Sequence, residues 1–364
     1  MSGVAAGTLH AVVLATLAFS SCHAAAKGKT MKTSDLAGVV DVAFGHGRFV
    51  TSHASGQAGV AVWDRADNAH TDPAAWLPRT ELRPGRLALS PDGARVVVAG
   101  GAGEPLLVID VRSGAVKARL RAPSAGVTAL AWSPDGAWLA VAGVDAATPP
   151  ASATAHPDKA VAFVSSGRVL VYELAKPAEP RWTLEGPSQD LVAVAFAPNS
   201  RTLTGLFKAG ALIVWSLANG QAGPSAELGD RGHALTISPD GRQLAAALTT
   251  EAGASRVELR DATTLAAITT LSGGPNLPVH LAYSSDGAQL VVTGFDAVQV
   301  WDTKAHTLRV KLDYDSDVGS GPRGAAFVPG GLLVVGGDPV LWRVWDLATR
   351  QPRVVVAPSK HAVN

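Results

Sequence analysis

A short phrase built on Ser-Pro-Asp-Gly recurs along this chain of 364 residues and constrains its fold more than any other feature. Close copies begin at residues 90, 133, 238 and 284, and weaker copies begin at 45, 197 and 328. In the copy at 90, Pro91 presets φ, Ser90 can hydrogen bond back to the backbone, and Gly93 can take a positive φ. Short apolar runs flank each phrase, so we expect each to be the corner of a β-hairpin.

The spacing of the copies predicts the architecture. Successive copies lie 45, 43, 64, 41, 46 and 44 residues apart, and a second phrase such as VAVWD (60–64) or VQVWD (298–302) follows each turn. A period of about 40–45 residues is typical of propeller blades with four strands each. We therefore predict an all-β fold, a seven-bladed β-propeller of four-stranded antiparallel blades whose first strands line a central channel. In the second unit the strands are expected at 86–90, 95–99, 106–110 and 116–121.

The aspartate of each close copy could be a turn residue or a calcium ligand. The four residues are Asp92, Asp135, Asp240 and Asp286. A calcium loop would need further acidic ligands around each of them, and the sequence supplies none. We therefore expect each carboxylate to hydrogen bond the backbone of its own turn.

Together, the turns and the ends of the second phrase resemble the WD-repeat β-propeller family, in its bacterial exported form. The family's dipeptide occurs three times: Trp63-Asp64, Trp301-Asp302 and Trp345-Asp346. The resemblance spans roughly residues 36–357 and implies the fold alone, because these motifs are structural. The Gly-His dipeptide that the family carries before each first strand is essentially missing. We therefore do not expect the family's buried Asp-His-Ser-Trp network, and we expect the Trp side chains only to pack.

The chain divides into a propeller and short flanking segments. We predict a signal peptide or lipoprotein signal at 1–26, a linker at 27–35, the propeller at 36–358 with an insertion at 144–168, and a tail at 359–364. Two modes of ring closure stay open. The last unit could pack directly on the first, with PRVVVA (352–357) as its own outer strand, or KTMKTSDL (29–36) could add a strand to it.

The N-terminal segment is typical of an exported protein. Residues 11–19 are an apolar run too short to span a bilayer, and Ala24, Ala25 and Ala26 offer a small-residue cleavage site. The first ten residues contain no Lys or Arg, so an uncleaved anchor or a misplaced start codon stays possible. We expect export to the periplasm or a lipid anchor in the bacterial envelope.

Cys22 is the only cysteine, so no disulfide can form within the chain. The sequence FSSC that ends at Cys22 is similar to a lipoprotein cleavage box, in which this cysteine would become the lipidated first residue. The alternative is a cysteine that is removed with the signal peptide. Contact with a membrane is expected only through such a lipid or an uncleaved anchor.

The interval of 64 residues marks an insertion at 144–168, between the second and third strands of the third unit. Such a loop opens on the face where the first strands begin, and long loops on rigid scaffolds often bind partners. Its candidate binding residues are His156, Asp158, Lys159 and Phe163. The alternative is a low-complexity loop that binds nothing.

The same face collects polar residues at the starts of the first strands. They are Asp41, Arg86, Asp190, Arg231, His233, His280 and Arg323. We expect them to ring the mouth of the channel, where they could bind an anionic ligand or a peptide. The alternative is a rim of solvated side chains with no ligand.

No catalytic or metal motif emerges from the sequence. The ten histidines contain no H-x-x-x-H or H-E-x-x-H spacing, and no Gly-x-Ser-x-Gly elbow follows a strand. The net charge is +1 without a basic block, which argues against a nucleic-acid partner. We therefore predict no cofactor and no enzyme, but a monomeric scaffold of the bacterial envelope that binds a protein or peptide. The alternatives are a small-molecule or lactone-hydrolase-like propeller with its site at the channel, by fold analogy, and a ligand sensor.

Overall fold

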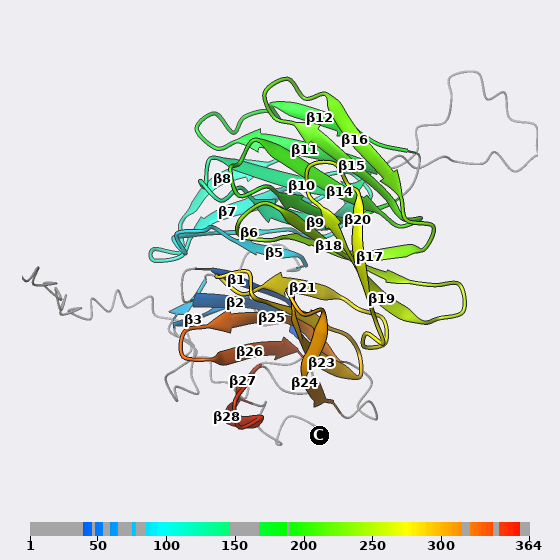
Figure 1. Ribbon diagram of the computed structural model, residues 1–364. Coiled ribbons are helices and arrows are strands. Elements are labelled where there is room, and N and C mark those ends of the chain that lie inside the picture. Colours follow the sequence, from blue (N-terminus) through cyan, green and yellow to red (C-terminus); the bar gives the residue numbers. More distant parts are fainter. Residues whose placement is uncertain are drawn as a thin grey trace, which may run out of the picture. The chain divides into compact units, whose positions relative to one another are not determined.

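The structure is a computed structural model, and it describes residues 39–45, 48–53, 59–64, 75–77, 85–145, 167–187, 190–314, 321–337 and 342–356. These residues contain strands and turns but no helix. The strands form seven four-stranded antiparallel sheets, and in each sheet the strands pair in the order of the sequence. The predicted fold, a seven-bladed β-propeller, is confirmed (Figure 1).

The first four blades have the following strands. Blade 1 contains β1 (Val39–Gly45), β2 (Arg48–His53), β3 (Val60–Asp64) and β4 (Ala75–Trp76). Blade 2 contains β5 (Leu87–Leu89), β6 (Arg95–Val98), β7 (Leu106–Asp110) and β8 (Val116–Leu120). Blade 3 contains β9 (Gly126–Trp132), β10 (Trp138–Val144), β11 (Gly167–Glu173) and β12 (Trp182–Glu185). Blade 4 contains β13 (Leu191–Phe196), β14 (Thr202–Phe207), β15 (Ala211–Ser216) and β16 (Ala222–Glu227).

The last three blades follow the same plan. Blade 5 contains β17 (Arg231–Ile237), β18 (Gln243–Thr249), β19 (Ser255–Asp261) and β20 (Ala267–Ser272). Blade 6 contains β21 (His280–Tyr283), β22 (Gln289–Thr293), β23 (Ala297–Asp302) and β24 (Thr307–Asp313). Blade 7 contains β25 (Pro322–Val328), β26 (Leu332–Gly337), β27 (Trp342–Asp346) and β28 (Gln351–Val356). In blade 2 each strand lies within one residue of its predicted bounds at either end.

The Ser-Pro-Asp-Gly phrases form the corners between first and second strands, as predicted. In the corner of blade 2 the Ser90 hydroxyl donates to Asp92 Oδ1 at 2.5 Å, and the Ala94 N–H donates to the same oxygen at 3.0 Å. Gly93 has φ 67°, a conformation that a residue with a Cβ adopts only at a cost. The Ser90 hydroxyl and the Ala94 N–H hold the pKa of the Asp92 carboxyl below its usual range. The turn interpretation of these aspartates is thus confirmed.

Each blade is apolar on both faces because each face packs on a neighbouring blade. In β6, Val96 and Val98 belong to a cluster shared with blade 1, whereas Val97 belongs to a cluster shared with blade 3. The described residues form seven such clusters, and each one joins two adjacent blades. Burying one valine side chain of this kind contributes roughly 1.5–3 kcal/mol relative to leaving it exposed. Period-2 alternation therefore sorts side chains between neighbours, not between core and solvent.

The ring closes where blade 7 packs on blade 1, which lie side by side in Figure 1. The Trp342 ring lies edge-on to Phe49 and Trp63, with centroids 5.4 and 5.7 Å away, and Phe49 stacks on Trp63 at 5.7 Å. Blade 7 takes all four of its strands from consecutive segments, including its own outer strand β28. Among the described residues, closure is therefore by direct packing of the first blade on the last. The segment 29–36, the alternative closing strand, lies outside the described residues.

The expectation that the Trp side chains only pack is wrong. The Trp63 indole N–H donates to Thr51 Oγ1 at 2.9 Å, and this hydroxyl lies 2.7 Å from His53 Nε2. The indole of Trp301 donates to Gln299 Oε1, and that of Trp345 donates to the Tyr314 hydroxyl. Blade 1 thus has a buried Trp-Thr-His chain without a Gly-His dipeptide before its first strand, because its histidine comes from the end of β2.

Replacement of Trp342 tests the closing contact. Trp342 is 2% exposed, so Trp342→Ala leaves a cavity at the junction and is expected to lower the free energy of unfolding by about 3–5 kcal/mol. Trp342→Phe should cost much less, because it keeps a ring against Phe49 and Trp63 and removes an indole N–H that has no hydrogen-bond partner in the described residues. Equilibrium urea denaturation measures both variants. A Trp342→Ala protein within about 1 kcal/mol of the parent would contradict this role for the junction.

The buried His53 makes the fold sensitive to acid. Burial lowers the pKa of His53 from 6.5 to about 4. Between these values the unfolded chain binds the proton and the folded chain does not, so stability falls as the pH drops from about 6.5 to about 4. The difference corresponds to about 3 kcal/mol. Urea midpoints measured across this range should fall less steeply for His53→Gln than for the parent, with the remaining slope due partly to His280, whose pKa burial also lowers to about 4. Identical slopes would rule out His53 as the acid-sensitive group.

Candidate functional site

All seven first strands begin around one cavity of about 720 Å³, which we call the mouth. Six residues predicted from the sequence line it: Asp41, Arg86, Asp190, Arg231, His233 and Arg323. They meet because each lies within two residues of the start of a first strand, and the seven starts lie at the same end of the ring. A cavity of this volume is within the usual range of ligand sites.

Two polar lining residues of the mouth were missed in the sequence. Lys208 directly follows β14, and Thr128 lies near the start of β9. In an antiparallel hairpin the end of the second strand lies beside the start of the first, so a residue that follows a second strand also reaches the mouth. This rule would have found Lys208, which ends the apolar run TLTGLF (202–207).

Blades 1 and 2 contribute an ion pair to the mouth. Arg86 Nη1 lies 3.8 Å from Asp41 Oδ1, and the Leu87 N–H donates to Asp41 Oδ2 at 2.8 Å. The Asp41 side chain is 14% exposed. Burial raises the pKa of this carboxyl, although Arg86, the Leu87 N–H and the nearby Arg323 oppose the rise. Asp41 is therefore fixed in place and largely screened from a ligand in the mouth.

Blade 4 supplies a second, more exposed ion pair. Lys208 Nζ lies 3.4 Å from Asp190 Oδ2, and both side chains are exposed to solvent by 40% or more. An exposed pair of this kind contributes at most about 1 kcal/mol to stability. Its main effect at the mouth is to balance one positive charge with one negative charge.

Arg231 of blade 5 and Arg323 of blade 7 are exposed, and neither side chain forms an ion pair or hydrogen bond within the described part of the chain. His233 follows Arg231 by two residues along β17 and lines both the mouth and the channel. Burial and the nearby Arg231 lower the pKa of His233, so its ring is neutral near pH 7. Its Nε2 atom is buried and makes no hydrogen bond in the described residues.

The channel below the mouth is a second cavity of about 580 Å³. Small apolar side chains of the first strands line it, including Ala131, Ala195 and Ala282. His280 lies here and not among the mouth residues, and its Nδ1 accepts the Ala325 N–H at 3.4 Å. The pKa of about 4 keeps this imidazole neutral at physiological pH.

The insertion begins and ends beside the mouth. Val144, the last residue of β10, lines the mouth, and β11 resumes at Gly167. Asp145 Oδ2 lies 3.0 Å from Arg168 Nη1, and this ion pair joins the two ends of the insertion. The insertion thus lies between second and third strands, as predicted, but His156, Asp158, Lys159 and Phe163 lie outside the described residues. Cys22 does as well.

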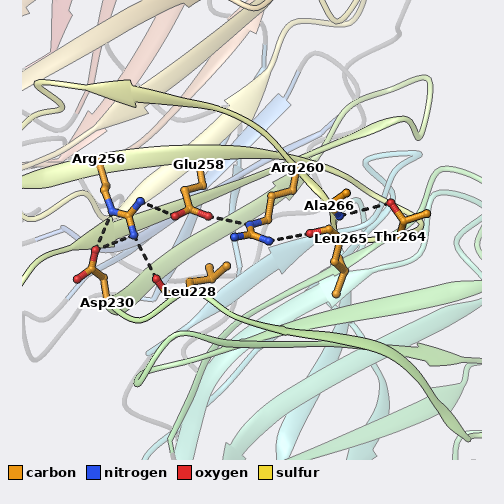
Figure 2. Close-up of polar contacts among 8 residues, drawn as sticks. All are labelled: Leu228, Asp230, Arg256, Glu258, Arg260, Thr264, Leu265 and Ala266. Atoms are coloured by element: carbon orange, nitrogen blue, oxygen red, sulfur yellow. Dashed lines mark hydrogen bonds and ion pairs between the residues drawn. The ribbon is translucent and has the colours of Figure 1, made fainter.

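Blade 5 carries a polar ladder beside the mouth, formed by Arg256, Glu258 and Arg260 on one face of β19 (Figure 2). Arg256 pairs with Glu258, and its Nε donates to Asp230 Oδ2 at 2.7 Å. Glu258 Oε2 accepts from Arg260 Nε at 2.7 Å, and Arg260 Nη1 donates to the Leu265 carbonyl oxygen at 2.7 Å. The ladder therefore runs from Asp230, next to the mouth, to the turn at the opposite end of the blade.

The ladder occupies positions that are apolar in most other blades. Cross-strand pairing places Arg260 where Trp63 and Trp301 stand in blades 1 and 6. Glu258 is 7% exposed, so its charge is tolerable only because two guanidinium groups neutralise it. The sequence RVELRD (256–261) contains all three residues of the ladder, but nothing in it points to the partner Asp230.

Among the described residues, no group of three or more His, Cys, Asp or Glu side chains could hold a metal ion. In the same residues no helix is long and apolar enough to cross a membrane.

Replacement of Glu258 tests the ladder. Glu258→Gln keeps the shape but leaves Arg256 and Arg260 without their shared counter-charge, so the free energy of unfolding should fall by about 2–4 kcal/mol. Glu227→Gln is the matched control, because Glu227 is exposed, and it should change stability by less than about 0.5 kcal/mol. Thermal and urea denaturation measure both. Equal stabilities for the two variants would show that the ladder is dispensable.

The comparison with family models finds one match, "WD domain, G-beta repeat", at residues 114–147. The matched segment contains β8 of blade 2 and the first two strands of blade 3, and it ends just inside the insertion. No curated protein matches the chain. The repeat match and the seven four-stranded blades together support a WD-repeat β-propeller.

Proposed function

We propose that this protein is a non-enzymatic scaffold that docks a protein or peptide partner on the face of the mouth. The carrying observation is the convergence of all seven first strands on one cavity of about 720 Å³ that holds four cationic and two acidic side chains. The base of the insertion adjoins the same cavity. A partner that covers the mouth could therefore contact both the mouth residues and the insertion.

The fold supports this function in two ways. WD40 propellers are commonly scaffolds for protein interactions and are generally not enzymes. In addition, the seven clusters between blades hold the first strands in a closed ring, so the mouth is largely formed before a partner binds. A preformed site loses little conformational entropy on binding.

We assign the scaffold to the bacterial cell envelope. The support is the sequence of the N-terminal segment, with its apolar run at 11–19, its small residues at Ala24–Ala26 and the lipoprotein-like box ending at Cys22. In that setting the chain is exported to the periplasm, or is held in the envelope by a lipid on Cys22, and acts as a monomer.

One observation favours a second candidate function, the binding of a small molecule at the channel. The mouth and the channel share Asp41, Arg86, Thr128, Val192, His233 and Val279 in their linings. Two neutral histidines, His233 and His280, lie along this path. A lactone-hydrolase-like activity would act at the same place, by analogy of fold alone.

Affinity capture with three variants of the tagged full chain tests the proposed function. The mouth variant carries Arg86→Ala, Arg231→Ala and Arg323→Ala, and a second variant lacks residues 146–160. The control carries Arg112→Ala, Arg201→Ala and Lys304→Ala, because these exposed residues lie in turns at the opposite end of the blades.

We expect the parent and the control to capture the same partner from solubilised envelope, and the mouth variant to capture about tenfold less or none, since truncated arginines are common hot spots. Thermal denaturation of each variant checks that its fold is intact. If both the mouth and the deletion variants retain every partner of the parent, the docking face is not the mouth. Small-molecule binding then becomes the leading function.

A further inference from the structure

We propose that the arc of the mouth formed by blades 5 to 7, with Arg231, His233 and Arg323, recognises an acidic peptide segment of the docked partner. This inference rests on the proposed function and adds the chemistry of the partner. The occupant is a stretch of Asp or Glu side chains that reaches into the mouth from the partner's surface.

The first step is the uneven distribution of charge around the mouth. Asp41 pairs with Arg86 in blades 1 and 2, and Asp190 pairs with Lys208 in blade 4. The two remaining cations, Arg231 and Arg323, have no ion-pair partner within 4 Å among the described residues. Among the described residues, the cations of the mouth that form no ion pair within 4 Å therefore lie on the arc from blade 5 to blade 7, although Arg323 also acts on Asp41 from a greater distance.

The second step explains why Arg231 stays unpaired although Asp230 precedes it in the chain. Figure 2 shows Asp230 in contact with Arg256, which holds its carboxylate at 2.7 Å and also donates to the Leu228 carbonyl oxygen at 3.2 Å. Glu258 in turn fixes Arg256 from the other side. The ladder thus engages the acid that precedes Arg231 in the chain, and the exposed Arg231 guanidinium has no ion-pair partner among the described residues.

The third step concerns the wall between the two arginines. Among the described residues, blade 6 contributes Pro278 and Val279 to this stretch of the mouth, and neither carries an acidic side chain. His233 lies on the same arc, and its buried Nε2 has no hydrogen-bond partner in the described residues. The arc therefore offers two exposed guanidinium groups that form no ion pair within 4 Å among the described residues, whereas the buried His233 Nε2 only lines its wall.

Carboxylates fit these groups best among the side chains of a protein partner. A guanidinium presents two parallel N–H donors that match the two oxygens of a carboxylate, and such charge-assisted bonds are about twice as strong as neutral ones. A segment with several carboxylates supplies one for Arg231 and another for Arg323, whereas a single acidic side chain supplies only one. A free phosphate has the same donor requirements and is an outcome that the test must separate.

The test is fluorescence anisotropy with the full chain and two labelled peptides, one of alternating Glu and Gly and one of alternating Gln and Gly. We expect the Glu peptide to bind at least about tenfold more tightly than the Gln peptide, and added salt to weaken it. Arg231→Ala with Arg323→Ala should weaken the Glu peptide about tenfold or more, whereas Arg112→Ala with Arg201→Ala, on the opposite end of the blades, should not. Arg231→Lys with Arg323→Lys should restore only part of the binding, because a lysine lacks the planar fork.

Several results would overturn the inference. The Glu and Gln peptides could bind equally, or the Arg231/Arg323 double variant could bind like the parent. Inorganic phosphate could displace the Glu peptide with an affinity equal to that of the peptide, which would point to a small anion. If affinity capture depends on the mouth but the Glu peptide does not bind, the acidic segment is wrong while the scaffold function holds. If the peptide binds and no captured partner depends on the mouth, the scaffold function fails instead.

Discussion

The packing of Trp342 against Phe49 and Trp63 is the contact on which the rest of the propeller depends. A blade of this protein is apolar on both faces, so each blade needs two neighbours to bury its side chains. Six junctions follow directly from the order of the chain, but the seventh has to join its two ends. Without that junction blades 1 and 7 would each present an apolar face to water, and the seven first strands would not be held around one mouth.

The repeated turn made most of this fold predictable. Ser90, Asp92 and Gly93 determine a corner through contacts within a few residues, and such contacts can be inferred from the sequence alone. The partners of the Trp side chains could not be inferred in this way. Trp63 donates to Thr51 of the adjacent strand, whereas Trp345 donates to Tyr314 of the preceding blade, so equivalent positions have unrelated partners. Those contacts depend on which side chains the packing of sheets brings together.

The candidate site was predictable in membership but not in electrostatics. The propeller topology places the starts of the first strands together. This rule predicted that Asp41, Arg231 and Arg323 lie at the mouth, where the structure has them. Which charges are neutralised depends on side-chain geometry, as when Asp230 pairs with Arg256 while the next residue, Arg231, pairs with none of the described residues. The charged ladder of β19 therefore influences which charges beside the mouth are paired. The ladder that stabilises blade 5 is thus also part of the charge distribution beside the mouth.

The closing junction also has a consequence for the order of folding. Phe49 and Trp63 are synthesised early, but Trp342, which covers them, is among the last residues of the propeller to leave the ribosome. The thermodynamic cost of closing so long a loop grows only slowly with its length, so the late contact can still be strong. Until blade 7 is made, the face of blade 1 that carries Phe49 and Trp63 stays exposed to water, and exposed apolar surface favours association with other chains. The blade that is made first is therefore the one whose apolar face is exposed for longest during synthesis.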